Sequence, residues 1–303
     1  MTELTVLQEK MANFSQVCQF KMNESMARHT SFHIGGEAEV MAFPTSREEL
    51  ASVLRLASEL GHTPAILGAG TNVLAPDGGI SGIVICLKDC MDGMELLDEN
   101  RIRVMAGVTM TRAAVFAANH GLGGMEFAHG IPGTIGGGVF MNAGAYGGEM
   151  KDIVESVEIM DFDGNIHTYC NEDMGFSYRH SVLEGKDLIV LSAVLCLQKE
   201  EPESIKAKMR ELQAKRSASQ PLDLPSAGSA FKRPVGGYAA ALIDQAGLKG
   251  YRVGDAAIST KHAGFAVNLG DATASDVQAL LQQVSDIVFE KSGIRLEPEV
   301  RIW

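Results

Sequence analysis

The sequence predicts an α+β fold that is rich in strands, and three observations support this. Short apolar runs and alternating apolar and polar residues, both typical of strands, recur between residues 30 and 197. Amphipathic segments with helix caps separate some of these runs. The chain has 303 residues, which is more than one average hydrophobic core requires, so two or three compact parts are expected.

Two helices are expected in the first half of the chain. The segment 46–61 begins with Ser46 and Glu49, which have the spacing of a capping box, and ends at Gly61, a common stop residue. The segment 109–121 ends in the same way, at Gly121. Strands are expected at the end of 30–44, at the start of 63–79, and at 82–88, 101–108, 153–160, 165–170 and 188–197.

The second half predicts a helical connector and a compact final part. Residues 201–219 are charged and helical in pattern, and a loop rich in Pro, Gly and Ser follows at 220–234. Thr273 and Asp276 have the spacing that caps a helix over 274–292. The other expected elements are a helix at 237–247, strands near 252–258 and 264–268, and a closing strand within 294–303.

These elements divide the chain into four expected regions. Residues 1–25 are weakly patterned and are expected to form a loose or helical arm. The main domain is expected at 26–198, in two lobes of about 26–88 and 89–198. A connector at 199–219 and a smaller α+β domain at 220–303 complete the chain.

Composition and charge argue against several classes of function. The formal net charge of −12 disfavours nonspecific nucleic-acid binding, which needs a basic field. No apolar run approaches the length of a membrane span. The N-terminal residues lack the basic and apolar regions of a signal peptide, so a cytoplasmic location is expected.

Cysteine and histidine spacing gives no sign of disulfide or metal chemistry. The five cysteines form no CxxC pair, and the eight histidines show no HExxH or HxH spacing. No metal site is therefore expected. Reduced, buried thiols are expected at Cys18, Cys86, Cys90, Cys170 and Cys196.

The stretch "GIPGTIGGGVFMNAGAYG", residues 130–147, has seven glycines in eighteen positions. It has no lysine in the place that a P-loop requires, and Pro132 interrupts the spacing of a dinucleotide fingerprint. A second glycine stretch, "LGAGTNVL" at 67–74, lacks the third glycine of that fingerprint. Each stretch taken singly is more often a set of structural turns.

Taken together, the two stretches point to a ligand site. Two glycine loops in one strand-rich region can contact a pyrophosphate from two sides, because glycine lets backbone N–H groups approach closely. Thr71, Asn72 and Thr134 add short hydrogen-bonding side chains. A flavin dinucleotide suits such a site, since it has a pyrophosphate and a large ring that needs an apolar slot.

Seven motifs in order carry a resemblance to a known family: "TSFHIGG", "LGAGTNVL", "EFAHGIPGTIGGGVFMNAGAYGGE", "FSYRHS", "KRSASQPLDLPSAGSAFKRP", "KHAGFAVN" and "LEPEVRI". From about residue 28 to its end, the chain resembles the UDP-N-acetylenolpyruvoylglucosamine reductases of bacterial peptidoglycan precursor synthesis. The compact stretch after Arg179 is similar to the shorter, type II form, which lacks an extra substrate-covering loop.

The resemblance implies a fold, cofactors and a reaction. It implies an FAD-binding domain of the vanillyl-alcohol-oxidase-like type, followed by a smaller substrate-binding domain. It also implies non-covalent FAD, NADPH as co-substrate, and reduction of UDP-N-acetylglucosamine enolpyruvate to UDP-N-acetylmuramate. A monomer is expected. The cofactor-binding residues implied by the two glycine motifs are Leu67, Gly68, Ala69, Gly70, Thr71, Asn72, Gly130, Ile131, Pro132, Thr134, Gly137, Ala143 and Gly144.

The resemblance also assigns three catalytic roles. Arg179 in "FSYRHS" matches the family's catalytic arginine, and its fixed charge suits an enolate formed by hydride attack on the enolpyruvyl β-carbon. Ser229 matches the family's proton donor. Glu299 matches the catalytic glutamate, although strand alternation alone leaves Glu297 on the same face. To donate a hydrogen bond to the enol, Glu299 needs a pKa raised by burial.

A cluster of cations and one tyrosine in or near the later motifs is expected to bind the UDP part of the substrate. These residues are Arg216, Lys232, Arg233, Tyr238 and Lys261. Lys232 and Arg233 lie close to Ser229 in sequence, so they either support its ionisation or bind the diphosphate. Such a cluster lets an acidic protein bind an acidic substrate.

Two rival functions stay open at this point. The first is a flavin-dependent sugar or alcohol oxidase on the same FAD scaffold, in which a histidine or cysteine often tethers the flavin. His129 is the nearby candidate, and it stands where the resemblance leads us to expect a smaller residue. It either contacts flavin or packs. The second rival is a noncatalytic flavin- or nucleotide-binding module, which the joint presence of Arg179, Ser229 and Glu299 disfavours.

Overall fold

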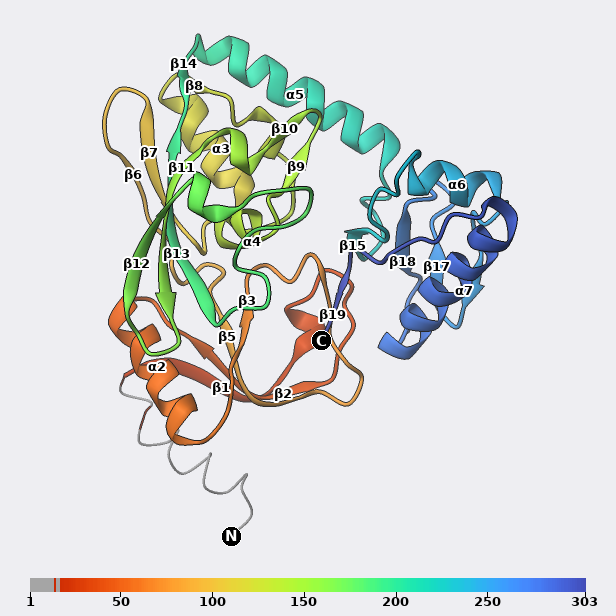
Figure 1. Ribbon diagram of the computed structural model, residues 1–303, viewed down its shortest axis with the longest axis horizontal. Helices are drawn as coiled ribbons and strands as arrows, with labels where there is room; N and C mark the ends of the chain where they lie inside the picture. The colour runs from red at the N-terminus through yellow and green to blue at the C-terminus, as the bar shows by residue number, and fades with distance from the viewer. Residues whose placement is uncertain (1–13, 15–16) are drawn as a thin grey trace. The chain divides into compact units, whose positions relative to one another are not determined.

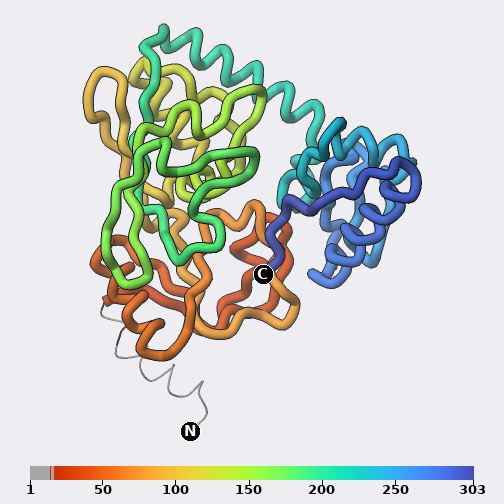
Figure 2. The backbone as a smooth tube through the Cα atoms, viewed as in Figure 1, coloured from red at the N-terminus to blue at the C-terminus, as the bar shows by residue number. Residues whose placement is uncertain are grey.

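The computed structural model describes residue 14 and residues 17–303 (Figures 1 and 2). The described chain divides into two compact units, and each is discontinuous in sequence. Unit 1 contains the described residues up to Met22, together with Val40–Ala69 and Gly82–Ala214. Unit 2 contains Asn23–Glu39, Gly70–Ser81 and Lys215–Trp303.

Unit 1 has an antiparallel sheet of five strands in the order β12-β11-β13-β7-β6. Helices α3 (Met110–Asn119) and α4 (Ile135–Phe140) contact each other, and α4 packs on β13 and β7. The strands are β12 (Ile166–Cys170), β11 (Val154–Asp161), β13 (Leu188–Cys196), β7 (Arg101–Met105) and β6 (Met94–Leu96).

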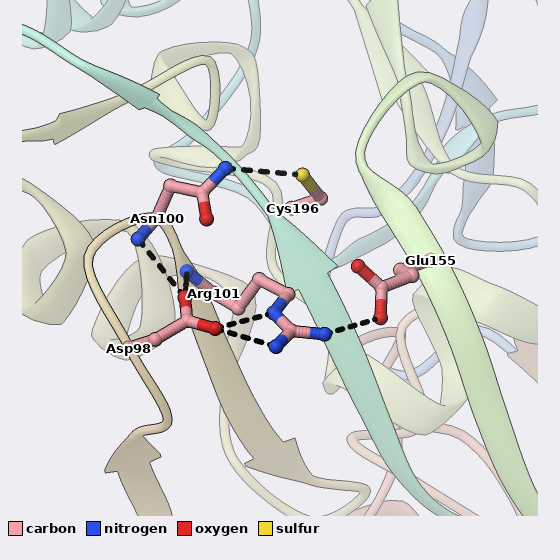
Figure 3. Close-up of polar contacts among 5 residues, drawn as sticks. All are labelled: Asp98, Asn100, Arg101, Glu155 and Cys196. Atoms are coloured by element: carbon pink, nitrogen blue, oxygen red, sulfur yellow. Dashed lines mark hydrogen bonds and ion pairs between the residues drawn. The ribbon is translucent and has the colours of Figure 1, made fainter.

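Arg101 joins neighbouring parts of this sheet by ion pairs (Figure 3). Its guanidinium lies 2.5 Å from Asp98 and 3.1 Å from Glu155 on β11. Hydrogen bonding to Arg101 lowers the pKa of the Asp98 carboxyl. The Asn100 amide donates to the Cys196 sulfur at 3.6 Å beside this cluster. The side chains are largely solvent-exposed, so these ion pairs bury no charge and contribute little to stability.

A second sheet has the order β1-β2-β5-β3. Strands β3 and β5 are parallel, with Leu67 opposite Cys86. Helix α2 (Arg47–Glu59) connects β2 to β3 in sequence. The strands are β1 (Gln19–Ser25), β2 (Glu37–Phe43), β5 (Ile80–Cys86) and β3 (Ala65–Leu67).

Unit 2 has a four-stranded antiparallel sheet in the order β15-β18-β17-β16 and two helices, α6 (Ala239–Gln245) and α7 (Ala274–Ser292). Phe32, Ile34 and Leu74 are buried in the same core as α7. Segments from the first third of the chain thus complete this core. The strands are β15 (Ser226–Ser229), β18 (Phe265–Asn268), β17 (Ala256–Ile258) and β16 (Arg252–Val253).

The helix ends that were predicted from local signals are confirmed. Ser46 accepts a hydrogen bond from the Glu49 N–H at the start of α2, while the Glu49 carboxylate accepts from the Thr45 N–H rather than closing the box on Ser46. Gly61 has a φ of 71° after the end of α2. Thr273 and Asp276 form the complete capping box of α7.

The expected connector is helical over α5 (Pro202–Ser219). The remaining elements are short. They are β4 (Val73–Leu74), β8 (Leu122–Gly123), β9 (Gly144–Ala145), β10 (Gly148–Glu149), β14 (Gln198–Lys199), β19 (Arg301–Ile302), and the 3-10 turns η1 (Met26–Arg28), η2 (Glu126–Ala128), η3 (Met150–Asp152) and η4 (Glu172–Met174).

Four expectations differ from the structure. Residues 19–25 of the expected N-terminal arm form β1, and the rest of that arm lies largely outside the described residues. The closing strand is limited to β19, because residues 297–299 join the segment after Ser229 only through one isolated bridge, at Pro298, before Arg301 and Ile302 pair with β4. The glycine tract, expected as loops, contains helix α4. Cys170 and Cys196 are exposed, since both stand at strand ends; all five cysteines are free.

The compact units also divide the chain differently from the four expected regions. Residues 23–39 and 70–81 belong with the C-terminal part, not with the rest of the expected main domain. The physical reason is burial, because Phe32, Ile34 and Leu74 lie in the unit 2 core. Among the described residues, no helix combines the length and the apolar character that a membrane crossing needs.

Candidate functional site

The two glycine stretches meet within unit 1. Gly68 follows strand β3, and a Cβ atom placed on it would lie 2.6 Å from the Thr134 hydroxyl oxygen. That separation is shorter than real Cβ contacts, so only glycine permits this approach. The prediction that the two stretches lie together is therefore supported at this contact.

The glycine tract has a second purpose, which is close packing against the protein itself. A Cβ on Gly136 would lie 3.0 Å from the Ala106 Cβ, and one on Gly138 would lie 2.7 Å from the Met110 sulfur. Thr134, only 2% exposed, caps α4 by accepting from the Gly137 N–H at 3.3 Å. Glycine here lets α4 settle closely on the sheet and on α3.

The other half of the first glycine stretch belongs to unit 2. Gly70 has a φ of 61°, and a Cβ on it would lie 2.0 Å from the His29 carbonyl oxygen. The Asn72 side-chain amide donates to the Glu299 carbonyl at 3.2 Å, and the Arg301 N–H donates to the Asn72 carbonyl at 3.0 Å. Asn72 thus bonds to the extended segment that carries Glu299 and Arg301.

The close contacts at Gly68 and Gly70 are with the protein itself, so packing within each unit requires glycine at these two positions. Binding of a pyrophosphate by these loops stays a prediction, which the close approach that glycine backbone allows to an anion favours. Some expected groups already have protein partners, because the Gly130 N–H donates to the Thr111 hydroxyl and the Ala143 N–H to the Gly138 carbonyl. Their direct contact with a cofactor stays a prediction, as does that of Leu67, Ala69, Thr71, Ile131, Pro132 and Gly144.

Arg179 stands at the tip of a two-residue turn in unit 1. Ser177 and His180 pair across the turn by two backbone hydrogen bonds of 3.1 and 3.2 Å. Arg179 has a φ of 55°, an uncommon conformation for a side chain of this size. Its Nη1 donates to the Gly144 carbonyl at 3.4 Å, and its guanidinium lies 5.2 Å from the centre of the Tyr178 ring.

Ser229 and Glu299 stand on neighbouring extended segments of unit 2. Ser229 ends β15 and pairs with Phe265 of β18. The Glu299 N–H donates to the Ala230 carbonyl at 2.9 Å, directly after Ser229. A bridge between Phe231 and Pro298 continues this pairing. Glu299 therefore lies on an extended segment outside the named strands, and the shared face of Glu297 and Glu299 stays a prediction.

The expected substrate-binding residues of unit 2 have different surroundings. The Arg233 guanidinium lies 4.7 Å from the centre of the Tyr238 ring, and Tyr238 is 63% exposed. Lys232 lies 3.8 Å from the Glu297 carboxylate. Arg216 is buried, and the Lys261 ammonium donates to the Ser217 carbonyl at 2.7 Å, near the end of α5. The structure thus brings Arg233 and Tyr238 together and ties Lys261 to α5.

Sequence reasoning missed Asn142, which lies inside the glycine tract and is 1% exposed. The signal was present as a polar residue in a run of small ones. His129 is half-buried after η2, and its N–H donates to the Glu126 carbonyl at 3.2 Å; the two alternatives for its side chain, contact with flavin or packing, stay open. Among the described residues, no group of three or more His, Cys, Asp or Glu is arranged to hold a metal.

Comparison with known proteins first defines the class. The profile of an FAD binding domain matches residues 38–169, which contain both glycine stretches. A solved 6-hydroxy-D-nicotine oxidase from Arthrobacter nicotinovorans shares the fold, with a TM-score of 0.57 over 92% of this chain and 88% of that one, at 12% identity. The profile match thus shows an FAD-binding domain, and the structural likeness shows a fold of the vanillyl-alcohol-oxidase-like type.

The particular family follows from closer relatives. The profile of the UDP-N-acetylenolpyruvoylglucosamine reductase C-terminal domain matches residues 220–303. Reductases of that name from Caldanaerobacter subterraneus subsp. tengcongensis and Clostridioides difficile are 46% and 44% identical, covering 98% and 93% of this chain and 98% and 92% of theirs. The crystal structure of the Thermus caldophilus enzyme has a TM-score of 0.81 at 38% identity, over 94% of this chain and 98% of that one. The chain belongs to the UDP-N-acetylenolpyruvoylglucosamine reductase family.

Proposed function

We propose that this protein reduces UDP-N-acetylglucosamine enolpyruvate to UDP-N-acetylmuramate with NADPH and FAD, a step that supplies peptidoglycan precursors. The observation that carries this proposal is full-length family membership, at 46% identity over 98% of the chain. The same membership favours a reductase over the oxidase alternative. Two further features support it: the FAD binding domain profile spans both glycine stretches, and the Arg179 turn presents a guanidinium at its tip.

The chemistry divides between the cofactor and the chain. FAD, when bound, supplies the hydride that originates from NADPH. The chain's part is to orient the enolpyruvyl ether, stabilise the charge that forms on its carboxylate side, and deliver a proton to the α-carbon. Leu67–Asn72 and the 130–144 tract are the segments proposed to hold the cofactor.

Arg179 is proposed to stabilise the enolate. Hydride addition at the β-carbon moves an electron pair toward the substrate carboxylate, and a guanidinium offers a permanent positive charge with a planar fork for that group. The turn at Ser177–His180 supports this role, because it presents the arginine at its tip. An uncommon backbone conformation of this kind is more frequent at functional sites than elsewhere.

Ser229 and Glu299 are proposed to complete the reaction. Ser229 gives its hydroxyl proton to the α-carbon, which collapses the enolate to the carboxylate product. A protonated Glu299 donates a hydrogen bond to the developing enol, so its carboxyl must keep a proton near neutral pH. The backbone bond between Glu299 and Ala230 keeps the two segments in fixed register. Lys232 and Arg233 stay candidates either for supporting Ser229 or for the diphosphate.

The test is anaerobic visible absorbance of the purified protein. We expect the flavin band to bleach on addition of NADPH and to return on addition of UDP-N-acetylglucosamine enolpyruvate, without oxygen. Return only when oxygen is admitted would establish the oxidase alternative instead. Arg179→Ala, Ser229→Ala and Glu299→Ala should each leave the bleaching intact and slow the return. The cytoplasmic location, the monomeric state and the type II assignment stay predictions.

A further inference from the structure

We propose that Asn142 is a positioning residue for Arg179: its buried side chain holds the turn that presents the guanidinium. This inference rests on the proposed function, because it acts through the role given to Arg179 there. All of the residues involved belong to unit 1.

All the hydrogen-bonding groups of the Asn142 side chain have partners inside the protein. Its Nδ2 donates to the Ser177 carbonyl at 3.0 Å and to the Glu149 carboxylate at 2.6 Å. Its Oδ1 accepts from the Lys151 N–H at 2.9 Å. Both donor hydrogens and the acceptor oxygen of the amide are therefore engaged, and only an amide of this orientation satisfies all three partners. With 1% exposure, no water replaces a lost bond cheaply.

One of these partners is the residue that begins the turn. Ser177 pairs with His180, and the two residues between them are Tyr178 and Arg179. The bond from Asn142 to the Ser177 carbonyl fixes the entry of the turn. On the exit side, the buried Ser181 hydroxyl donates to the Phe140 carbonyl at 2.7 Å.

Three residues at the end of the glycine tract thus hydrogen-bond to the turn or to the residue after it. Phe140 anchors its exit, Asn142 anchors its entry, and the Gly144 carbonyl accepts directly from Arg179 at 3.4 Å. The turn needs this support, because Arg179 has a φ of 55° and a non-glycine residue leaves that region when its surroundings loosen. Asn142 itself has a φ of 42°, which asparagine tolerates better than most residues.

The test uses Asn142→Gly, which keeps the positive φ without strain and removes all three bonds. Its matched control is Asn171→Ala, because the Asn171 amide also donates to two carbonyls of unit 1, those of Lys151 and Val154, but does not bond to the turn. Flavin content and the thermal midpoint confirm that each variant is folded. If Asn142→Gly does not fold, Asn142→Ser replaces it, since serine retains one hydroxyl donor.

We expect the Asn142 variant to slow reoxidation of the reduced enzyme by the enolpyruvyl sugar about tenfold, and to leave reduction by NADPH within about twofold. Asn171→Ala should change neither rate. In an Arg179→Ala background, the Asn142 substitution should cause no further loss, because the group through which it acts is gone.

Two outcomes would overturn the inference. One is a folded Asn142 variant with an unchanged reoxidation rate. The other is an equal fold-loss in the native and the Arg179→Ala backgrounds, which would mean that Asn142 acts independently of Arg179. A different outcome, in which Arg179→Ala alone leaves reoxidation unchanged, would refute the role that the proposed function gives to Arg179.

Discussion

Gly68→Ala tests the contact between the two glycine stretches of unit 1. The added methyl would lie 2.6 Å from the Thr134 hydroxyl oxygen, whereas ordinary contact begins at 3.4 Å, so the atoms must separate by about 0.8 Å. Thr134 has little room to move, because it is 2% exposed and its hydroxyl caps α4. Gly68 does not have a positive φ, so alanine at this position adds no backbone strain to the measured loss of stability.

The expected cost follows from these two effects. Overpacking of this size costs about 1–3 kcal/mol, and loss of a helix cap costs about 0.5–2 kcal/mol. Because the second loss occurs only if the hydroxyl is displaced, we expect the free energy of unfolding to fall by about 2 kcal/mol. If the same backbone contacts FAD, a shift of this loop should also weaken FAD binding about tenfold, which corresponds to about 1.4 kcal/mol.

The assay is urea unfolding together with FAD titration of the apoprotein. Gly78→Ala is the control, because a Cβ at Gly78 meets nothing within 4 Å. The decisive comparison is the same substitution in a Thr134→Ala background, where the nearest remaining atom, the Cβ of residue 134, lies 3.7 Å away. There Gly68→Ala should cost less than about 0.5 kcal/mol. An undiminished cost in that background would refute the reasoning.

Three further predictions rest on other contacts. Burial raises the pKa of Asp77, but hydrogen bonds from Ala274 and Ser275 outweigh it and hold the pKa below its ordinary 3.8. Asp77→Asn should therefore lower the free energy of unfolding by about 1 kcal/mol at pH 7, a figure that allows for the exposure of this carboxylate. The difference in unfolding free energy between the two proteins should shrink as the pH falls below 3.8, because the native carboxylate then becomes protonated. Urea midpoints at pH 7 and pH 3 check this. Burial raises the pKa of Cys18 to about 11 and of Cys90 to about 12, so iodoacetamide at pH 8 should label only the exposed Cys170 and Cys196, as read by peptide mass spectrometry. Asn72→Ala removes the bond to the Glu299 carbonyl and should lower kcat about fivefold with little change in the KM for NADPH; an unchanged kcat would mean that this bond does not position Glu299.

Local sequence signals predicted the local structure well. The helices α2, α3 and α7 begin at Ser46, Thr109 and Thr273, each of which accepts a hydrogen bond from the third residue after it. Glycine stops the first two, with φ of 71° at Gly61 and 67° at Gly121. These features depend on neighbours within one helical turn, so the order of residues is sufficient to predict them.

Local signals could not predict which distant segments are buried together. The helix α4 has three glycines between Ile135 and Val139 that favour a loop by propensity, yet Thr134 caps it and the sheet packs against it. The closing strand was overpredicted because its residues change partner: Pro298 forms an isolated bridge with Phe231, whereas Arg301 and Ile302 pair with β4. Propensity describes one segment, whereas these outcomes depend on which other segment lies beside it.

The sequence by itself determined the family and the reaction class, because these follow from the identity and order of residues along the chain, whereas the catalytic roles of Arg179, Ser229 and Glu299 stay predictions. The tertiary structure decided that residues 23–39 and 70–81 share a core with the C-terminal part, since Phe32, Ile34 and Leu74 are buried there. It also decided that the Asn142 side chain hydrogen-bonds to the Ser177 carbonyl at the start of the Arg179 turn, although 35 positions separate the two residues. Such contacts arise from burial of distant segments together, and no local pattern of residues records them.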